Sequence, residues 1–318
     1  MQRNYSIDIL KFICATLVVF LHTTSVYQNM VLPLTRCAVP CFFMISGYLL
    51  YKGGGIGTER IKRNLIRVVK ITLWATIFFV FWKEFTSIKQ GGFLPSAKQM
   101  ISWIVFNNCP FGFHLWYLYA YLYVLMIILV IDQHRLWNWL FVSIPILLLA
   151  DLAFGKYSLV VFNREYTYIL VRNFLFVGLP YFALVAWLKT KITFMTNRKM
   201  TLLGGVILFS LTSQLEKYIL VSIEKCPTRE HYISSTFLAI SLCLLLLSIK
   251  VEKPIAISKI GERDSLYIYI FHPIFILVLS IFSKEMGLTD VYLWIAPFAV
   301  LFFTIAFIYA LRKINVIK

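Results

Sequence analysis

Charged residues are scarce in this sequence, and acidic ones are the scarcest. Only 14% of the 318 residues are charged, whereas a soluble domain carries roughly 25%. Lys and Arg number 31 against 14 Asp and Glu, which gives a formal net charge of +17. In a soluble protein this excess would suggest nucleic acid, but no zinc-ligand spacing, RNA-binding signature or basic amphipathic helix accompanies it. We therefore expect no nucleic-acid partner and assign the basic residues to cytoplasmic loops and anionic lipid headgroups.

The sequence also lacks the motifs of several enzyme classes. It has no H-E-x-x-H motif, no carboxylate pair and no Cys/His nucleophile arrangement. The glycines of KGGGIG, residues 52–57, are not followed by Gly-Lys-Ser/Thr, so they do not form a nucleotide-binding P-loop. The spacing of the histidines does not call for a metal, and we expect none. Of six dispersed cysteines, Cys109 and Cys226 fall in expected outer loops where a disulfide is conceivable.

Long apolar runs are abundant. The chain is 60% hydrophobic with a mean hydropathy of +0.80, and many runs approach the ~20 residues that cross a bilayer. This pattern predicts an all-α, polytopic integral membrane protein with about ten transmembrane helices. Their approximate ranges are 7–27, 37–51, 71–87, 114–131, 138–152, 168–188, 201–215, 233–249, 265–283 and 291–311. Without an internal repeat or room for a soluble domain, residues 1–318 are expected to form a single membrane domain.

The basic residues also predict the orientation of these helices. With the N-terminus inside, the cytoplasmic segments would be 1–11, 52–70, 132–137, 189–200, 250–264 and 312–318. These segments hold most of the 31 Lys and Arg residues, as the positive-inside rule requires. We therefore predict an N-in, C-in topology. The outer loops at 88–113, 153–167 and 216–232 are long enough to shape a substrate surface.

Three ionisable residues lie in the first apolar run, IDILKFICATLVVFLH. Lys11 and His22 are eleven residues apart, which is almost three helical turns, and Asp8 lies about one turn before Lys11. All three therefore share one face, which must meet protein or a water-filled cavity rather than lipid. Asp8 and Lys11 alone would also fit an interfacial ion pair, with Lys11 extending to the headgroups. His22 follows a strongly apolar stretch, and a neutral imidazole there can take a proton from a hydroxyl.

Four segments together resemble the membrane-bound acyltransferase family 3. The first is Lys or Arg, ten residues, then His, here Lys11 and His22. The others are RCAVPCFFMISGYLL (36–50), HLWYLYAYLYVLMI (114–127) and SLYIYIFHP (265–273), similar to the family's FF-x-x-SG, H-x-W-[FY]-L and Y-x-x-H-P segments. They occur in the expected order over most of the chain. The resemblance implies a multi-pass O-acyltransferase of the bacterial cytoplasmic membrane that modifies surface glycans.

The resemblance also implies roles for individual residues. The donor would be acyl-CoA, with acetyl-CoA favoured, bound from the cytoplasm, and the acceptor a hydroxyl of an extracytoplasmic glycan or lipid-linked glycan. His22 would act as general base or carry the acyl group transiently, while Asp8 and Lys11 support a polar channel. Arg60 and Arg63, about one turn apart after the glycine-rich turn, would bind the CoA phosphates. Without the family, a plain positive-inside cluster is the favoured interpretation of these arginines.

Five further residues are candidates for substrate binding. Arg36 and Arg172 begin apolar runs on the expected outer side, where each can orient an acceptor; Arg36 can instead anchor to headgroups. His114 and Trp116 suit stacking on a sugar, although an aromatic residue at that depth is often part of the membrane belt. His272 either bounds an acyl tunnel or is a satisfied core histidine.

A transporter or flippase of a glycan or small polar solute is the alternative from another functional class. Buried Asp, Lys and His residues are common along permeation paths. Against it, the sequence shows no internal repeat and no pair of corresponding broken hydrophobic segments. A sensor or uptake module is a third possibility, and no sequence feature points to it.

Overall fold

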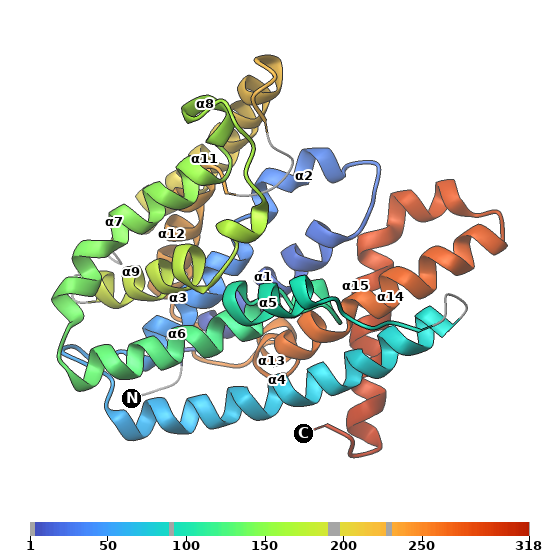
Figure 1. The fold of residues 1–318 in the computed structure, drawn as a ribbon, viewed down its shortest axis with the longest axis horizontal. Helices are drawn as coiled ribbons and strands as arrows, with labels where there is room; N and C mark the ends of the chain where they lie inside the picture. The colour runs from blue at the N-terminus through green and yellow to red at the C-terminus, as the bar shows by residue number, and fades with distance from the viewer. Residues whose placement is uncertain (1–3, 89–91, 190–197, 227–230, 318) are drawn as a thin grey trace. The chain divides into compact units, whose positions relative to one another are not determined.

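The computed structural model describes residues 4–88, 92–189, 198–226 and 231–317, and within these residues every regular element is helical (Figure 1). The predicted all-α class is therefore confirmed. The chain divides into two compact units. Unit 1 comprises Met1–Phe42, Thr193–Ile219 and Tyr232–Lys318, and unit 2 comprises Phe43–Ile192 and Leu220–His231.

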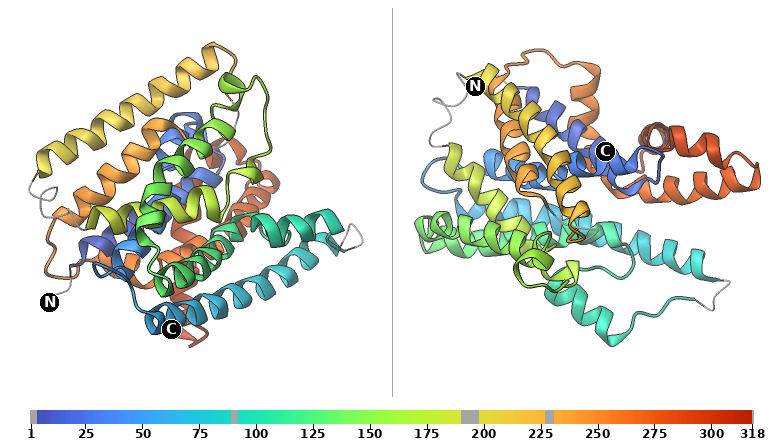
Figure 2. Two further views of the ribbon diagram at one scale, coloured as in Figure 1. Left: turned by 60° about the vertical axis from the view of Figure 1, so that its left-hand side comes forward. Right: turned by 90° about the horizontal axis from the view of Figure 1, so that it is seen from above.

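Unit 1 is built around α1 (Ser6–His22), whose buried residues are apolar from Leu10 onward. The helices that pack against α1 are α2 (Gln28–Thr35), α12 (Ile233–Ser248), α13 (Ala256–Arg263), α14 (Ser265–Glu285) and α15 (Thr289–Lys313). α14 and α15 lie side by side in every view (Figures 1 and 2). α11 (Lys199–Ser222) meets α12 where the rings of Phe209 and Phe237 stack, with centroids 5.2 Å apart.

Unit 2 is centred on α6 (Trp116–Gln133), which the chain enters through the short turn η2 (Phe113–Leu115). The elements that pack against α6 include α4 (Thr58–Ser87), α7 (Trp137–Phe154) and the π-helical segment η4 (Phe174–Gly178). α3 (Ala38–Leu50) begins in unit 1 and continues in unit 2, where Gly47 allows contact with α9 (Leu179–Lys189). A Cβ at Gly47 would lie 2.2 Å from the carbonyl oxygen of Phe182. Smaller elements are α5 (Ala97–Phe106), α8 (Ser158–Val161) and η3 (Tyr168–Leu170).

Large apolar side chains cover the outside of several long helices. On α4, Leu73, Ile77, Phe81 and Phe85 recur every fourth residue, and each is more than half exposed. A soluble helix would bury such a stripe, so it fits contact with lipid. The described stretches long and apolar enough to cross a bilayer are Gln28–Leu50, Thr58–Ser87, Phe113–Gln133, Trp137–Phe154, Ser265–Glu285 and Thr289–Lys313. The protein is therefore a multi-pass membrane protein, while the count of about ten helices and the N-in, C-in orientation stay predictions.

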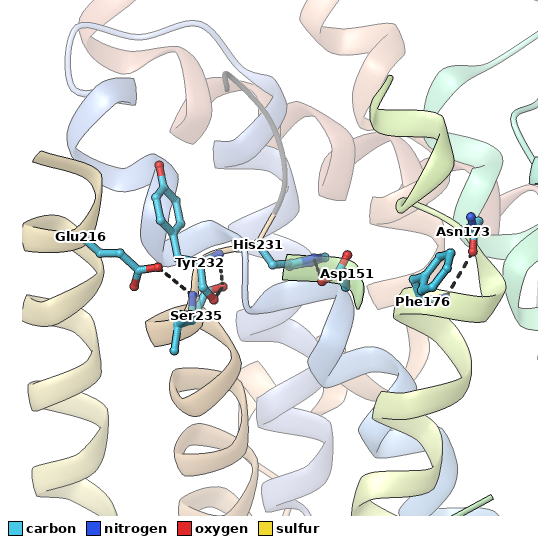
Figure 3. Close-up of polar contacts among 8 residues, drawn as sticks. Asp151, Asn173, Phe176, Glu216, His231, Tyr232 and Ser235 are labelled. Atoms are coloured by element: carbon cyan, nitrogen blue, oxygen red, sulfur yellow. Dashed lines mark hydrogen bonds and ion pairs between the residues drawn. The ribbon is translucent and has the colours of Figure 1, made fainter. Parts of the chain in front are cut away.

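The structure differs from the hydropathy pattern where polar side chains interrupt or begin a helix. α1 ends at His22, earlier than the predicted run 7–27, because Thr23 is extended and its hydroxyl donates to the Val19 carbonyl. The run 168–188 is divided by Asn173, whose backbone is extended and whose side chain accepts N–H groups of the next turn, including that of Phe176 (Figure 3). The expected outer loop 88–113 contains α5, and α11 extends past the predicted end of 201–215.

Candidate active site

The first turns of α1 carry the predicted ionisable pair. Lys11 Nζ lies 2.9 Å from Asp8 Oδ1, and the Asp8 side chain is 4% exposed against 23% for Lys11. α13 covers this end so closely that a Cβ on Gly261 would lie 1.8 Å from the Asp8 carbonyl oxygen. A glycine is therefore required for this packing. The contact between Asp8 and Lys11 follows the predicted spacing, and its role in a channel or as an anchor stays a prediction.

His22 and His272 lie together at the other end of α1. His22 is the last residue of that helix, and its ring stacks on the ring of His272, with centroids 5.5 Å apart and planes inclined by 21°. His272 comes from α14 and is fully buried, whereas His22 is half-buried. Two residues separated by most of the sequence thus share one location within unit 1. Among the contacts between predicted site residues that the structure describes, this one involves His22, the residue predicted to act as the base.

Pro273 determines which nitrogen of His272 carries a proton. In a regular helix the N–H of residue 273 would donate to the carbonyl of Tyr269, but proline has no N–H. His272 Nδ1 lies 2.8 Å from that carbonyl oxygen. Because a carbonyl can only accept, Nδ1 is the donor, and in the neutral ring Nε2 keeps the lone pair. The His-Pro sequence therefore fixes both the tautomer and the direction of this imidazole.

A second proline ties down the segment that follows His22. Pro297 lies inside α15 and leaves the carbonyl of Leu293 without its helical donor. The backbone N–H of Val26 donates to this carbonyl at 3.2 Å, and the Tyr27 hydroxyl donates to the neighbouring carbonyl of Trp294 at 3.1 Å. Such bonds matter in a membrane, where water is not at hand to satisfy a freed carbonyl. The chain leaving His22 is thereby attached to α15.

Arg36 lies in the connection between α2 and α3. It is half-buried and forms the C-terminal cap of α2, with its backbone N–H donating to the Leu34 carbonyl. α2 also contains a proline, Pro33, and the Asn29 carbonyl that it frees accepts from Lys217 Nζ on α11. Arg36 is thus carried by a helix that is fixed to the rest of unit 1, while its part in acceptor binding stays a prediction.

Unit 2 brings Trp116 and Arg172 together. The guanidinium carbon of Arg172 lies 5.4 Å from the Trp116 ring centroid and 4.2 Å from that of Tyr168. Both distances are in the range of cation–π contacts. His114 is buried in η2, just before Trp116, with its ring edge-on to Phe79 at 4.6 Å. Three of the predicted substrate residues thus come from the entrance to α6 and the segment before α9.

A residue that the sequence analysis did not single out, Asn107, holds these two segments together. It is fully buried; its side-chain amide donates to the Trp116 carbonyl at 3.3 Å, and its Oδ1 accepts the N–H of Phe174 at 3.1 Å. Its backbone is left-handed, with φ of 53°, a conformation that asparagine tolerates better than most residues. One side chain therefore links the start of α6 to the segment that carries Arg172.

Arg60 and Arg63 lie in the first turns of α4. Arg60 is half-buried and donates to the Leu49 carbonyl at 2.7 Å, whereas Arg63 is exposed. Lys189, at the end of α9, donates to the Tyr48 and Tyr51 carbonyls, each at 2.6 Å. These cations satisfy carbonyls at the C-terminal end of α3 that lack helical donors.

Positive charge is concentrated at this end of α3. Burial, together with the positive charges of Arg60 and Lys52, lowers the pKa of the Lys189 ammonium. A cation whose charged form is disfavoured by neighbouring cations marks a place where an anion would be stabilised.

A family model described as an acyltransferase domain, that of acyltransferase family 3, matches residues 4–313. This chain belongs to acyltransferase family 3. No curated protein and no solved structure matches it. The family match spans residues of both compact units and makes the protein a membrane acyltransferase.

This acyltransferase contains a buried histidine–aspartate contact that the sequence analysis missed. His231 Nδ1 lies 3.1 Å from Asp151 Oδ2, and the two side chains are 8% and 1% exposed. Figure 3 shows His231 pointing toward Asp151, which lies near the end of α7. The signal in the sequence was an aspartate at the end of an apolar run, since ionisable residues at membrane depth are costly and need a partner. The pair attaches the segment before α12 to α7 within unit 2.

The structure also bears on metal binding and on the possible disulfide. Among the residues that it describes, no group of three His, Cys, Asp or Glu side chains is arranged to hold a metal ion. Cys109 and Cys226 are not joined to each other, so the conceivable disulfide is not formed. Burial raises the pKa of the Cys109 thiol to about 11. In this family member Cys109 is therefore a packed side chain rather than a reactive one.

Proposed function

We propose that this protein is an integral-membrane O-acyltransferase that moves an acyl group, acetyl in the simplest case, from cytoplasmic acyl-CoA to a hydroxyl of an extracytoplasmic glycan or lipid-linked glycan in the bacterial cytoplasmic membrane. The observation that carries the proposal is the stacking of His22 on His272 at the end of α1. The chain belongs to a family whose domain is an acyltransferase. The contact brings together the histidine of the first motif and the histidine of the last.

His22 is the general base of the proposed reaction. Its neutral imidazole accepts the proton of the acceptor hydroxyl as the oxygen attacks the thioester carbonyl. The tetrahedral intermediate collapses with cleavage of the carbon–sulfur bond. The imidazolium returns its proton to the leaving thiolate, so that an ester and free CoA are formed and the histidine is regenerated. A transient acyl-histidine would give the same products in two steps.

The surroundings of His22 suit a group that becomes positive during the reaction. As the last residue of α1, it lies at the negative end of the helix dipole, which stabilises a cation there. The neighbouring His272 donates from Nδ1 to a carbonyl and is fully buried, where an unpaired charged ring would be costly. A neutral ring stacked on His22 adds no charge that would oppose protonation. His272 therefore supports His22 as a base.

The donor is proposed to bind at the basic end of α4. Arg63 is exposed, and Arg60 lies near Lys189 and Lys52, so phosphate groups of CoA would meet several cations there. For the acceptor, Trp116 and Tyr168 present aromatic rings around the Arg172 guanidinium. Aromatic rings stack on sugars, and a guanidinium donates hydrogen bonds to their hydroxyl or acidic groups. Arg36 and His114 are further candidates for acceptor binding.

The experiment is an assay of CoA release by the protein purified in detergent, with acetyl-CoA as donor and cell-surface glycan or water as acceptor. We expect His22→Ala to lower the rate by about 100-fold or more, because general base catalysis contributes that much, while thermal unfolding stays close to wild type. His134→Ala is the matched control, since His134 is an exposed histidine at the end of α6. Full activity of His22→Ala would refute the mechanism, and a wild-type protein that never releases CoA would refute the enzymatic function.

A further inference from the structure

The glycine-rich segment between α3 and α4 forms a defined turn. Gly53, Gly54 and Gly57 have φ of 65°, 93° and 91°, values that residues with a side chain rarely adopt. The N–H of Lys52 donates to the carbonyl of Gly55 at 2.9 Å, and the N–H of Gly54 donates to the Tyr51 hydroxyl at 2.9 Å. The turn ends at Gly57, the residue that precedes α4.

A carboxylate from another helix closes over this turn. Asp132, next to the end of α6, accepts the N–H of Ile56 on Oδ1 at 2.8 Å and the N–H of Gly57 on Oδ2 at 2.9 Å. Trp137 Nε1 donates to Oδ1 at 3.0 Å and fixes the carboxylate from the other side. A Cβ on Gly55 would lie 2.8 Å from Oδ1, so a side chain at this position would displace the carboxylate. Asp132 is thus held by three donors from two segments of unit 2.

This carboxylate occupies the position where a phosphate commonly binds. Backbone N–H groups at the start of a helix, with the positive end of its dipole, form a ready anion site. Here the N–H groups of Ile56 and Gly57, the two residues just before α4, bond to Asp132. The turn therefore does not offer these two donors to a nucleotide, and we assign phosphate binding to the side chains that follow. Those are Arg60 and Arg63, in the first turns of α4.

We propose that Asp132 is a positioning residue of the acyl-CoA site. By fixing the backbone just before α4, it sets the direction in which Arg60 and Arg63 leave the helix. Arg60 shows the consequence, since it reaches back to the Leu49 carbonyl across the same turn. The inference rests on the proposed binding of CoA phosphates by these arginines. It adds that their placement depends on a negative side chain that does not itself contact the phosphates.

The experiment measures the Kd of acetyl-CoA and of 3′-dephospho-acetyl-CoA for the full-length protein in detergent, together with thermal unfolding. The variants are Asp132→Asn, Asp132→Glu, Arg60→Gln, Arg63→Gln and the double variant Asp132→Asn with Arg63→Gln. Asparagine keeps the shape of the carboxylate but offers one acceptor oxygen in place of two. We expect Asp132→Asn to raise the Kd of acetyl-CoA about tenfold, as for loss of one hydrogen bond to a charged group. Asp132→Glu should recover part of the affinity.

The control is another carboxylate at the start of a helix. Glu216 accepts the N–H groups of Ile233 and Ser234 at 2.8 and 2.9 Å and so caps α12 (Figure 3). Glu216→Gln removes the same kind of bond in unit 1, and we expect it to lower the unfolding temperature while the Kd of acetyl-CoA stays unchanged. A general loss of structure would raise the Kd of acetyl-CoA and the Kd of 3′-dephospho-acetyl-CoA in both Asp132→Asn and Glu216→Gln.

The double variant separates positioning from other effects. If Asp132 acts through the arginines, its substitution costs little further affinity once Arg63 is replaced, so the two effects are not additive. Additive effects, or an unchanged Kd in Asp132→Asn, would overturn the inference and leave the donor site standing. If Arg63→Gln and Arg60→Gln both bind acetyl-CoA as the wild type does, the proposed donor site itself is wrong, whatever Asp132 does.

Discussion

Replacement of Pro273 by alanine should make the protein more stable and less active. Proline inside a helix costs up to about 3 kcal/mol relative to alanine, and α14 carries this cost at the residue after His272. The alanine substitution would restore a backbone N–H that bonds to the Tyr269 carbonyl. That carbonyl now accepts from His272 Nδ1 at 2.8 Å, and the restored N–H would compete for the same oxygen.

The size of the activity loss follows from this one bond. A hydrogen bond of this kind contributes about 1 kcal/mol net, or a factor of about five in an equilibrium between two ring orientations. We therefore expect Pro273→Ala to lower the rate of CoA release about fivefold while raising the unfolding temperature. A purely structural role of Pro273 would move stability and activity in the same direction.

Thermal unfolding and CoA release, measured on one preparation, test this prediction. The matched control is Pro145→Ala, which removes a proline from the interior of α7 without touching either stacked histidine. It should raise the unfolding temperature with no loss of activity. Activity of Pro273→Ala equal to wild type, or an equal loss in Pro145→Ala, would refute the reasoning.

Two further predictions concern the buried groups of unit 2. Asp151→Asn should destabilise the protein by about 1.5–3 kcal/mol, the contribution of a hydrogen bond to a charged group. Thermal unfolding should show this loss in comparison with Asp290→Asn, which alters an exposed residue of α15. Equal unfolding temperatures of the two variants would contradict a stabilising contact between Asp151 and His231. Because burial raises the pKa of Cys109 to about 11, its alkylation by iodoacetamide should be slow at pH 8 and should accelerate about tenfold per pH unit until about pH 11. Mass spectrometry of the alkylated sites should find Cys226 modified well before Cys109, and similar rates at pH 8 would contradict the burial of Cys109.

Local spacing and hydropathy were sufficient for the features that depend on neighbours in the sequence. The contact between Asp8 and Lys11 follows from helical geometry alone, and long apolar runs predicted α6, α7, α14 and α15 nearly to the residue. Hydropathy does not register where a helix is interrupted by a side chain that bonds to the backbone. For that reason the end of α1 and the break at Asn173 escaped prediction.

Contacts between distant parts of the chain were beyond the sequence. The stacking of His22 on His272 and the placement of Arg172 over Trp116 depend on how helices pack, which no local pattern encodes. Family motifs and position in the apolar runs singled out these residues without saying which of them touch. Asp132 was missed for a different reason. An aspartate at the predicted cytoplasmic end of a helix looks like an ordinary surface residue in the sequence. Its role becomes visible only when the structure shows that it accepts N–H groups of the glycine-rich turn.

The central position of α1 has a consequence for biosynthesis. α1 leaves the ribosome before four of the helices that pack on it, α12 to α15. Until these four are made, Asp8, Lys11 and His22 lack most of their native surroundings, and the nascent α1 must be held in the membrane or the insertion machinery with its polar face uncovered. The surroundings of α1 are therefore complete only after α15 has been made. A chain truncated before α14 would retain His22 but lack His272, the ring on which it stacks.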